Sequence, residues 1–153
     1  MVILLSQCLL INTMNQSTNN IKKKNRINLS DLELRTRQRN DKGKSIVLSW
    51  YDNDNFVATI LIDTIPASDG YKWFGSFRIS KKYRNHGLSE QILKLAINKY
   101  GAGALSVNKD NEIAMRIYKK FGFEISETKI DDKYYFMYLP IVLYRENAYG
   151  WLI

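Results

Sequence analysis

The chain has 153 residues, a formal net charge of +8 and an apolar content of 45%, which is the length of one domain and the composition of an ordinary soluble globular protein. A single cysteine, Cys8, excludes an intrachain disulfide and a cysteine-based zinc cluster, and a single histidine, His86, excludes a multi-histidine metal site. This cysteine usage fits a reducing, cytoplasmic location, and no bound metal is expected.

Residues 1–28 are expected to form a poorly defined N-terminal extension. Met1–Ile11 is apolar, but it is too short to span a bilayer and lacks the basic residue that precedes the apolar run of a signal peptide. It fits a first strand, a short buried helix or an extension upstream of a start at Met14 better than a peripheral anchor. Asn12–Asn28 is polar and rich in asparagine and lysine, which is typical of a flexible linker.

The globular domain is predicted over residues 29–139, and it begins with antiparallel strands. Apolar and charged residues alternate from Leu32 to Arg37, which indicates a half-exposed strand. Ser45–Tyr51 and Phe56–Ile62 are β-branched and aromatic, and the turn residues between them predict a hairpin. A longer loop then leads to a predicted strand at Trp73–Ile79.

The loop after this strand, Ser80–Gly87, is basic and leads directly into a predicted helix at Leu88–Tyr100, where apolar residues recur on one face. The first amides of a helix lack intrahelical acceptors and lie at the positive end of the helix dipole, so they favour phosphate. Arg84 adds a charge that pairs with phosphate oxygens, and Gly87 lets a ligand approach the backbone closely.

A second strand–helix unit follows. Ala104–Val107 is expected to lie parallel to the earlier strand, because a helix crosses between them. Asp110 is expected to cap a helix at Asn111–Phe121, whose apolar stripe includes Tyr118.

The domain is predicted to end with a hairpin of Phe123–Ile130 and Tyr134–Leu139, after which Pro140 breaks the pattern. Residues 140–153 are apolar and aromatic, and they are expected to pack on the domain or in a dimer.

Two motifs resemble those of the GNAT acyltransferase superfamily, whose members bind acetyl-CoA. The run Arg84-Asn85-His86-Gly87-Leu88-Ser89 resembles the Arg/Gln-x-x-Gly-x-Gly/Ala signature, and the pattern from Asn111 through Ala114 and Tyr118 to Gly122-Phe123 is similar to the second hallmark. The resemblance covers Ser45 to Leu139. It implies an α/β (α+β) fold with a mixed, mostly antiparallel central sheet and flanking helices.

The resemblance also implies an activity and a set of site residues. The activity is N-acetyl transfer from acetyl-CoA to an amine by direct attack in a ternary complex. Tyr118 would be catalytic, because a phenol near the leaving thiolate supplies or shares a proton. The residues expected to bind the cofactor, through loop amides, strand backbone or a side chain, are Phe77, Ile79, Arg84, Asn85, Gly87, Leu88, Ser89 and Asn111.

Each assignment has a structural alternative. The loop Ser80–Gly87 would otherwise be an ordinary strand-to-helix connection. Tyr118 would be a core residue on the apolar stripe, and Asn111 would be a helix cap. The general base is not identified, because Trp73–Ser76 lacks the glutamate that many relatives carry there. Asp63, Asp69 or a water relay remain candidates.

The expected partner is a small-molecule or protein amine acceptor, with no membrane and a monomeric or homodimeric chain. The charge of +8 also favours polyanions, so an enzyme that modifies nucleic acid or its binding proteins is an alternative. A regulatory protein that binds CoA with weak or no turnover is another, because no base is apparent.

Overall fold

The computed structural model describes residues 26–39 and 42–140. The predicted N-terminal segment Met1–Ile11, most of the predicted linker Asn12–Asn28 and the tail Ile141–Ile153 lie outside the described residues.

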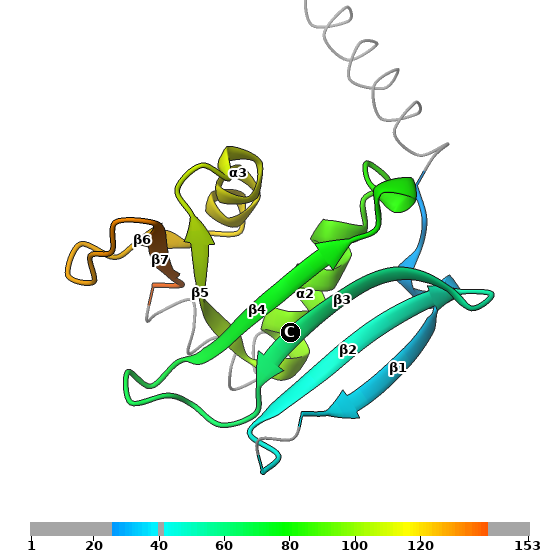
Figure 1. Cartoon of the computed structure of the whole chain (residues 1–153), viewed down its shortest axis with the longest axis horizontal. Helices are drawn as coiled ribbons and strands as arrows, with labels where there is room; N and C mark the ends of the chain where they lie inside the picture. Colours follow the sequence, from blue (N-terminus) through cyan, green and yellow to red (C-terminus); the bar gives the residue numbers. More distant parts are fainter. Residues whose placement is uncertain (1–25, 40–41, 141–153) are drawn as a thin grey trace, which may run out of the picture.

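The described residues form one mixed sheet with helices packed on it (Figure 1). The elements in chain order are η1 (Leu29–Asp31), β1 (Glu33–Gln38), β2 (Ser45–Asp52), β3 (Asn55–Asp63), β4 (Lys72–Ile79), η2 (Lys81–Tyr83), α2 (Leu88–Tyr100), β5 (Ala102–Asn108), α3 (Glu112–Lys120), β6 (Glu124–Ile125) and β7 (Tyr134–Tyr138). The seven strands lie in the order β1-β2-β3-β4-β5-β7-β6, and only β4 and β5 are parallel. This confirms the predicted fold class.

The core lies between the sheet and α2, which runs behind β3 and β4 in Figure 1. α2 begins and ends where the apolar period predicts, and Gly101 stops it in the left-handed conformation with φ 72°. Its buried face packs against alternate residues of the strands, because side chains of a strand point to opposite faces in turn. The buried residues of this face of α2 are Leu88, Ile92, Leu93, Ala96 and Ile97.

The strand predicted to be half-exposed is present as β1, but the predicted burial is wrong. All six of its residues are exposed, including Leu34 at 42%. β1 is the edge strand and pairs only with β2, so its apolar side chains lie beyond the part of the sheet that α2 covers.

The final hairpin is much shorter than predicted, because β6 contains only Glu124–Ile125. Beyond it, polar side chains take over the backbone amides: Ser126 Oγ accepts from Lys129 N at 3.1 Å, and Asp131 Oδ1 accepts from Lys133 N at 2.8 Å. Such local bonds compete with a strand ladder. The apolar residues of this stretch therefore favour a strand. Its serine and aspartate side chains bond the backbone amides instead, and the stretch forms a loop.

The sheet opens in the middle of β4. β4 and β5 pair at Lys72–Ala102, Trp73–Ala104 and Phe74–Leu105 and then part. Next to this point, β4 shifts register against β3, and Ser76 has a left-handed φ of 48°. An extra residue of this kind is a β-bulge, which bends a strand and frees backbone groups from pairing. The opening between β4 and β5 positions the candidate site.

Candidate active site

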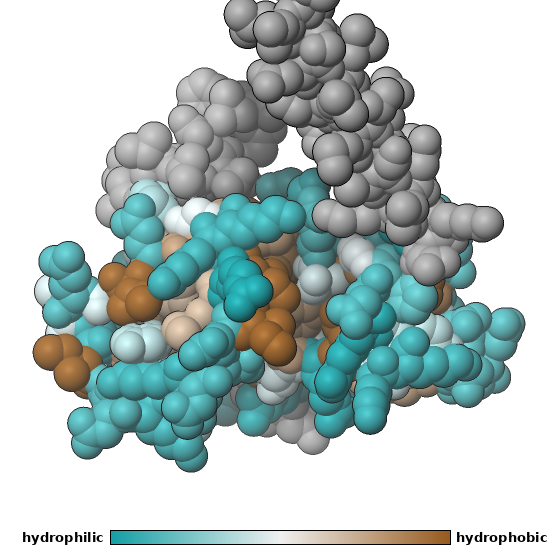
Figure 2. Space-filling model, turned by 90° about the horizontal axis from the view of Figure 1, so that it is seen from above, coloured by the Kyte–Doolittle hydropathy of each residue, from teal (hydrophilic) through white to brown (hydrophobic). Residues whose placement is uncertain are grey.

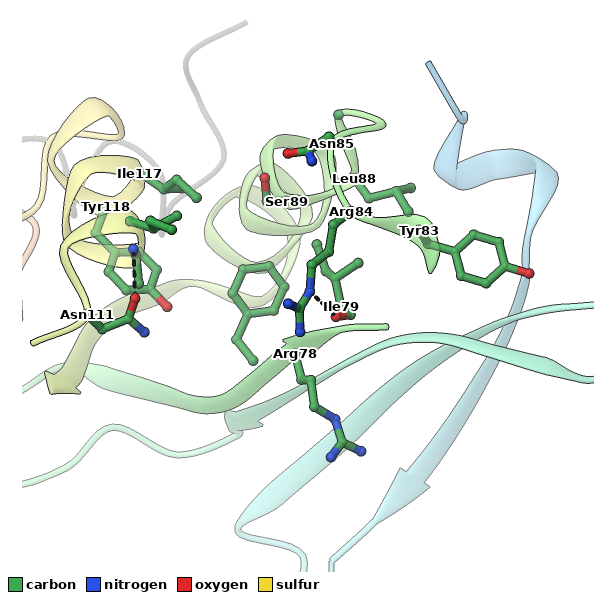
Figure 3. A pocket seen from close by; sticks show the side chains of 14 residues that line it. Arg78, Ile79, Tyr83, Arg84, Asn85, Leu88, Ser89, Asn111, Ile117 and Tyr118 are labelled. Atoms are coloured by element: carbon green, nitrogen blue, oxygen red, sulfur yellow. Dashed lines mark hydrogen bonds between the residues drawn. The ribbon is translucent and has the colours of Figure 1, made fainter. Parts of the chain in front are cut away.

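A cavity of about 540 Å³ lies between the end of β4, the start of α2 and one side of α3 (Figure 3). Seen from above, apolar surface lies in the middle of the face that carries α3 and the loop before α2, with hydrophilic side chains around it (Figure 2). All nine residues that the sequence singles out line this cavity. Its full lining is Phe77, Arg78, Ile79, Tyr83, Arg84, Asn85, Gly87, Leu88, Ser89, Asn111, Ile113, Ala114, Ile117 and Tyr118.

The loop at one end of the cavity is fixed by its own contacts. Tyr83 is 5% exposed, and its hydroxyl donates to the Asp52 carboxylate at 3.0 Å. Gly87 directly precedes α2 with φ 77°, a conformation that disfavours a side chain. The N-cap residue Gly87 offers no side chain to the first amides of α2, so within the described residues an anionic ligand in the cavity can take that place.

Arg84 reaches into the same cavity. Its Nε donates to the carbonyl oxygen of Ile79 at 3.0 Å, so its guanidinium lies over the last residue of β4 (Figure 3). Two consequences follow for the predicted roles. A positive charge stands near the uncapped end of α2, and the Ile79 carbonyl has a protein donor that a ligand must share or replace.

Tyr118 stands at the other end of the cavity, on α3. It is 8% exposed and packs edge-on against Phe74 and Phe123, with ring centroids 5.8 Å and 6.2 Å away. Burial raises the pKa of Tyr118 to about 12, because the low-polarity surroundings disfavour the phenolate. The phenol is therefore a proton donor throughout the physiological pH range.

The start of α3 differs from the prediction in its cap. Asn111, not Asp110, is the N-cap, and its Oδ1 accepts from Ala114 N at 3.1 Å. The apolar stripe predicted for this helix is only partly covered, because Ala114 and Ile117 are half-buried. Ile113, which lies outside that stripe, is 74% exposed. These three residues give the cavity an apolar wall.

A second cavity, of about 200 Å³, lies where β4 and β5 have parted. Gly75 and Ser76 line it from β4, and Ser106 lines it from β5. It shares Phe77, Asn111 and Tyr118 with the first cavity. Tyr118 thus faces the place where the two cavities meet.

Acidic side chains are absent from both linings within residues 26–39 and 42–140. Of the two aspartates proposed as bases, Asp63 accepts from Ser45 Oγ at 3.2 Å and Asp69 accepts from Trp73 Nε1 at 3.1 Å. Neither lines either cavity. Over the same residues, no three acidic, histidine or cysteine side chains are grouped to hold a metal. No described helix is long and apolar enough to cross a membrane.

Sequence reasoning missed one part of the site, the segment that precedes β1. Ile27 N donates to His86 O at 3.1 Å, and the Gln91 side chain donates to Ile27 O at 2.7 Å and accepts from Leu29 N at 2.9 Å. These hydrogen bonds therefore hold the segment before β1 against the loop that precedes α2. Ile27 and Leu29 interrupt the polar stretch before them, and they are the only signal that could have found it.

Several solved structures share this fold. Protein PH1933 of Pyrococcus horikoshii OT3 aligns with a TM-score of 0.54 and 23% identity, over 61% of this chain and 63% of its own. The GNAT domain of S. lividans PAT gives 0.52 and 15%, over 65% and 62%. The PaiA N-acetyltransferase of Thermoplasma acidophilum, solved with coenzyme A, gives 0.52 and 17%, over 64% and 62%. The alignments thus span less than two thirds of each of these chains.

Comparison with curated protein sequences gives no match. Residues 14–123, more than half of the chain, match the sequence profile of a single family. The match includes the loop before α2, the split strands and Tyr118. The chain therefore belongs to the acetyltransferase (GNAT) family, whose co-substrate is acetyl-CoA.

Proposed function

We propose that this protein is an N-acetyltransferase that moves an acetyl group from acetyl-CoA to an amine by direct attack in a ternary complex. The observation that carries the proposal is the opening of the sheet after Phe74. It joins the cavity at the uncapped start of α2 to a second cavity, and Tyr118 stands where they meet. One cavity suits the nucleotide thioester and the other suits the amine.

The first cavity fits the phosphates of acetyl-CoA. Arg84 and the first residues of α2, Leu88 and Ser89, line this cavity, and both a guanidinium and the amides of a helix start prefer anions. Gly87 has a φ of 77°, which a side chain would strain, and the Arg26 side chain lies 3.4 Å from the place that a Cβ would take. We assign phosphate binding to the loop from Arg84 to Ser89.

Backbone groups of Phe77 and Ile79 are assigned to the pantetheine arm. β5 does not pair with β4 beyond Phe74, so one edge of β4 can bond an extended ligand as another strand would. This assignment requires the Arg84 side chain to share the Ile79 carbonyl or to leave it.

In the reaction, the amine nitrogen forms a bond to the thioester carbon, and the carbon–sulfur bond breaks. The electron pair of that bond passes to sulfur, and the proton lost by the amine balances the one that sulfur gains. We assign Tyr118 to the sulfur, as a hydrogen-bond donor or proton donor. A phenol with a pKa of about 12 is a weaker acid than a thiol, so hydrogen bonding alone lowers the energy of the thiolate without full transfer.

Calorimetric titration with acetyl-CoA, followed by thiol release on a panel of amines, tests the proposal. Saturable binding and acceptor-dependent thiol release are expected. The absence of binding would overturn the assignment of the first cavity.

A second candidate is a protein that binds acetyl-CoA with little turnover. The observation that favours it is that the described lining of neither cavity contains a carboxylate to deprotonate an amine. Binding without thiol release on any acceptor would favour this candidate over the enzyme.

A further inference from the structure

Two aromatic side chains beside the second cavity, Trp73 and Phe136, contact the ammonium group of Lys129. The rings of Trp73 and Phe136 lie with centroids 6.1 Å apart, and the Lys129 ammonium sits 4.6 Å from the first and 4.4 Å from the second. Both distances are within the range of cation–π attraction. We call the surface formed by Trp73 and Phe136 the aromatic shelf.

The shelf faces away from the helices. Phe74 packs on Tyr118 and Phe123, and adjacent strand residues point to opposite faces, so Trp73 lies on the other side of the sheet. Trp73 and Phe136 are half-buried, while Lys129 is exposed. The exposed Lys129 ammonium lies over both rings, and Tyr138 packs edge-on against Trp73 with ring centroids 5.4 Å apart.

The loop between β6 and β7 positions the backbone of Lys129. Ser126 N donates to Phe136 O at 2.8 Å, and Ser126 Oγ accepts from Lys129 N at 3.1 Å. This single serine ties the backbone of Lys129 to the strand that carries one ring of the shelf. The loop thus places the backbone of Lys129 close to the strand that carries Phe136.

Asp69 orients the other ring and adds negative charge at its edge. Its carboxylate accepts from Trp73 Nε1 at 3.1 Å and from the Tyr138 hydroxyl at 3.4 Å. A cation on the shelf therefore meets two ring faces and a carboxylate close to one of them. Each of these features attracts positive charge.

The shelf adjoins the second cavity from both strands. Phe136 is paired with Ser106, which lines that cavity, and Trp73 precedes Gly75, which also lines it, by two residues. Two residues of strand span about 7 Å. A molecule with two basic groups this far apart can reach the cavity and the shelf together.

We propose that the aromatic shelf is a subsite for a second cationic group of the amine acceptor, and that this group displaces the Lys129 ammonium. The inference rests on the proposed function and names its substrate class: acceptors that carry an ammonium or guanidinium about 7 Å from the reacting amine. A small diamine and a peptide with a basic side chain both meet this description.

The first test compares acceptors of equal length. We expect kcat/KM per reacting amine for 1,4-diaminobutane to exceed that for 4-aminobutan-1-ol roughly twofold to thirtyfold, the range that one cation–π site supports. Trp73→Leu and Phe136→Leu should each reduce this ratio. A second arm compares a glycine-rich tripeptide ending in arginine amide with one ending in leucine amide, and it decides between the small-molecule and peptide sources.

The loop lysines give a matched pair of variants. Lys129→Met uncovers the shelf and should lower KM for the diamine. Lys133→Met removes the same charge from the same loop, but the Lys133 ammonium lies over the Tyr134 ring and not over the shelf. Equal effects of the two variants, or a diamine no better than the amino alcohol, would overturn the proposal.

A binding measurement separates this proposal from the proposed catalysis. The indole N–H signal of Trp73, assigned through Trp73→Phe, should shift when 1,4-diaminobutane is added and stay unchanged with 1,4-butanediol, which has the same length and carries no cation. A shift in a protein that releases no thiol would support the shelf and count against turnover. No shift in a protein that does acetylate amines would refute the shelf and leave the activity standing.

Discussion

Burial of the Tyr118 phenol beside two phenylalanine rings makes it a donor that does not ionise at working pH. Tyr118→Phe removes only the hydroxyl. We expect kcat to fall on the order of a hundredfold, the lower range for loss of a general acid, while the dissociation constant of acetyl-CoA changes little. Thiol-release assays measure kcat, and calorimetry measures the dissociation constant of acetyl-CoA.

Tyr100→Phe is the matched control, because Tyr100 is half-buried at the far end of α2 and lines neither cavity. Equal kcat values for Tyr118→Phe and the unaltered protein would show that Tyr118 is a core residue alone.

The raised pKa of Tyr118 also predicts a change in stability at high pH. The folded protein keeps the proton up to a pKa of about 12, whereas the unfolded chain loses it near 10. The unfolded state therefore binds fewer protons above pH 10, and the free energy of unfolding falls as the pH rises through this window. The full effect is about 3 kcal/mol, from two pKa units at 1.36 kcal/mol each.

Denaturant unfolding of the unaltered protein and of Tyr118→Phe at several pH values isolates this contribution, because the other tyrosines titrate in both. The stability of the unaltered protein should decline relative to the variant above pH 10. Parallel curves would mean that the phenol is solvated in the folded state.

Among the secondary-structure elements, α2 connects the loop of the site to the segment before β1 through Gln91. Gln91→Ala removes a donor to Ile27 O and an acceptor from Leu29 N. We expect a loss of about 1–3 kcal/mol in the free energy of unfolding, since two part-buried hydrogen bonds of about 0.5–1.5 kcal/mol each are lost. Urea denaturation measures it, with Asn98→Ala on the exposed face of α2 as the control. Equal losses for the two variants would contradict the bracing role of Gln91.

The sequence predicts elements well where local chemistry decides them. α2 is found to the residue because its apolar period ends at Gly101. β6 is not, because Ser126 and Asp131 bond backbone amides that a strand would have paired. Most residues of the first motif, and Asn111, Ala114 and Tyr118 of the second, line one cavity.

Contacts between distant residues are not visible in a single sequence. Gln91 and Ile27 are 64 residues apart, and only the docking of the first segment on α2 brings them together. Trp73 and Phe136 become neighbours because β7 pairs with β5 beside β4. The order of strands β5-β7-β6 decides this, and no local pattern encodes it.

At the scale of the whole molecule, the charge of +8 predicts that salt weakens acetyl-CoA binding. Counterions screen the attraction between the phosphates and the basic surface. Raising NaCl from about 50 mM to about 500 mM should increase the dissociation constant several-fold. Arg84→Gln should weaken binding and reduce the salt dependence, because Arg84 lies in the cavity.

Lys42→Gln removes an equal charge in the turn between β1 and β2, away from the cavity. It should leave both the affinity and its salt dependence nearly unchanged. If Lys42→Gln and Arg84→Gln behave alike, net charge rather than a built phosphate site governs binding.

The opening in the sheet has a mechanical consequence. Within the sheet, strands β1–β4 and strands β5–β7 are joined by three residue pairs. Backbone pairing this short makes local opening easier at this junction than between β2 and β3, which share eight pairs. An extended molecule bonded to the freed edge of β4 adds to this pairing, so we expect acetyl-CoA to slow amide hydrogen exchange in β4 and β5.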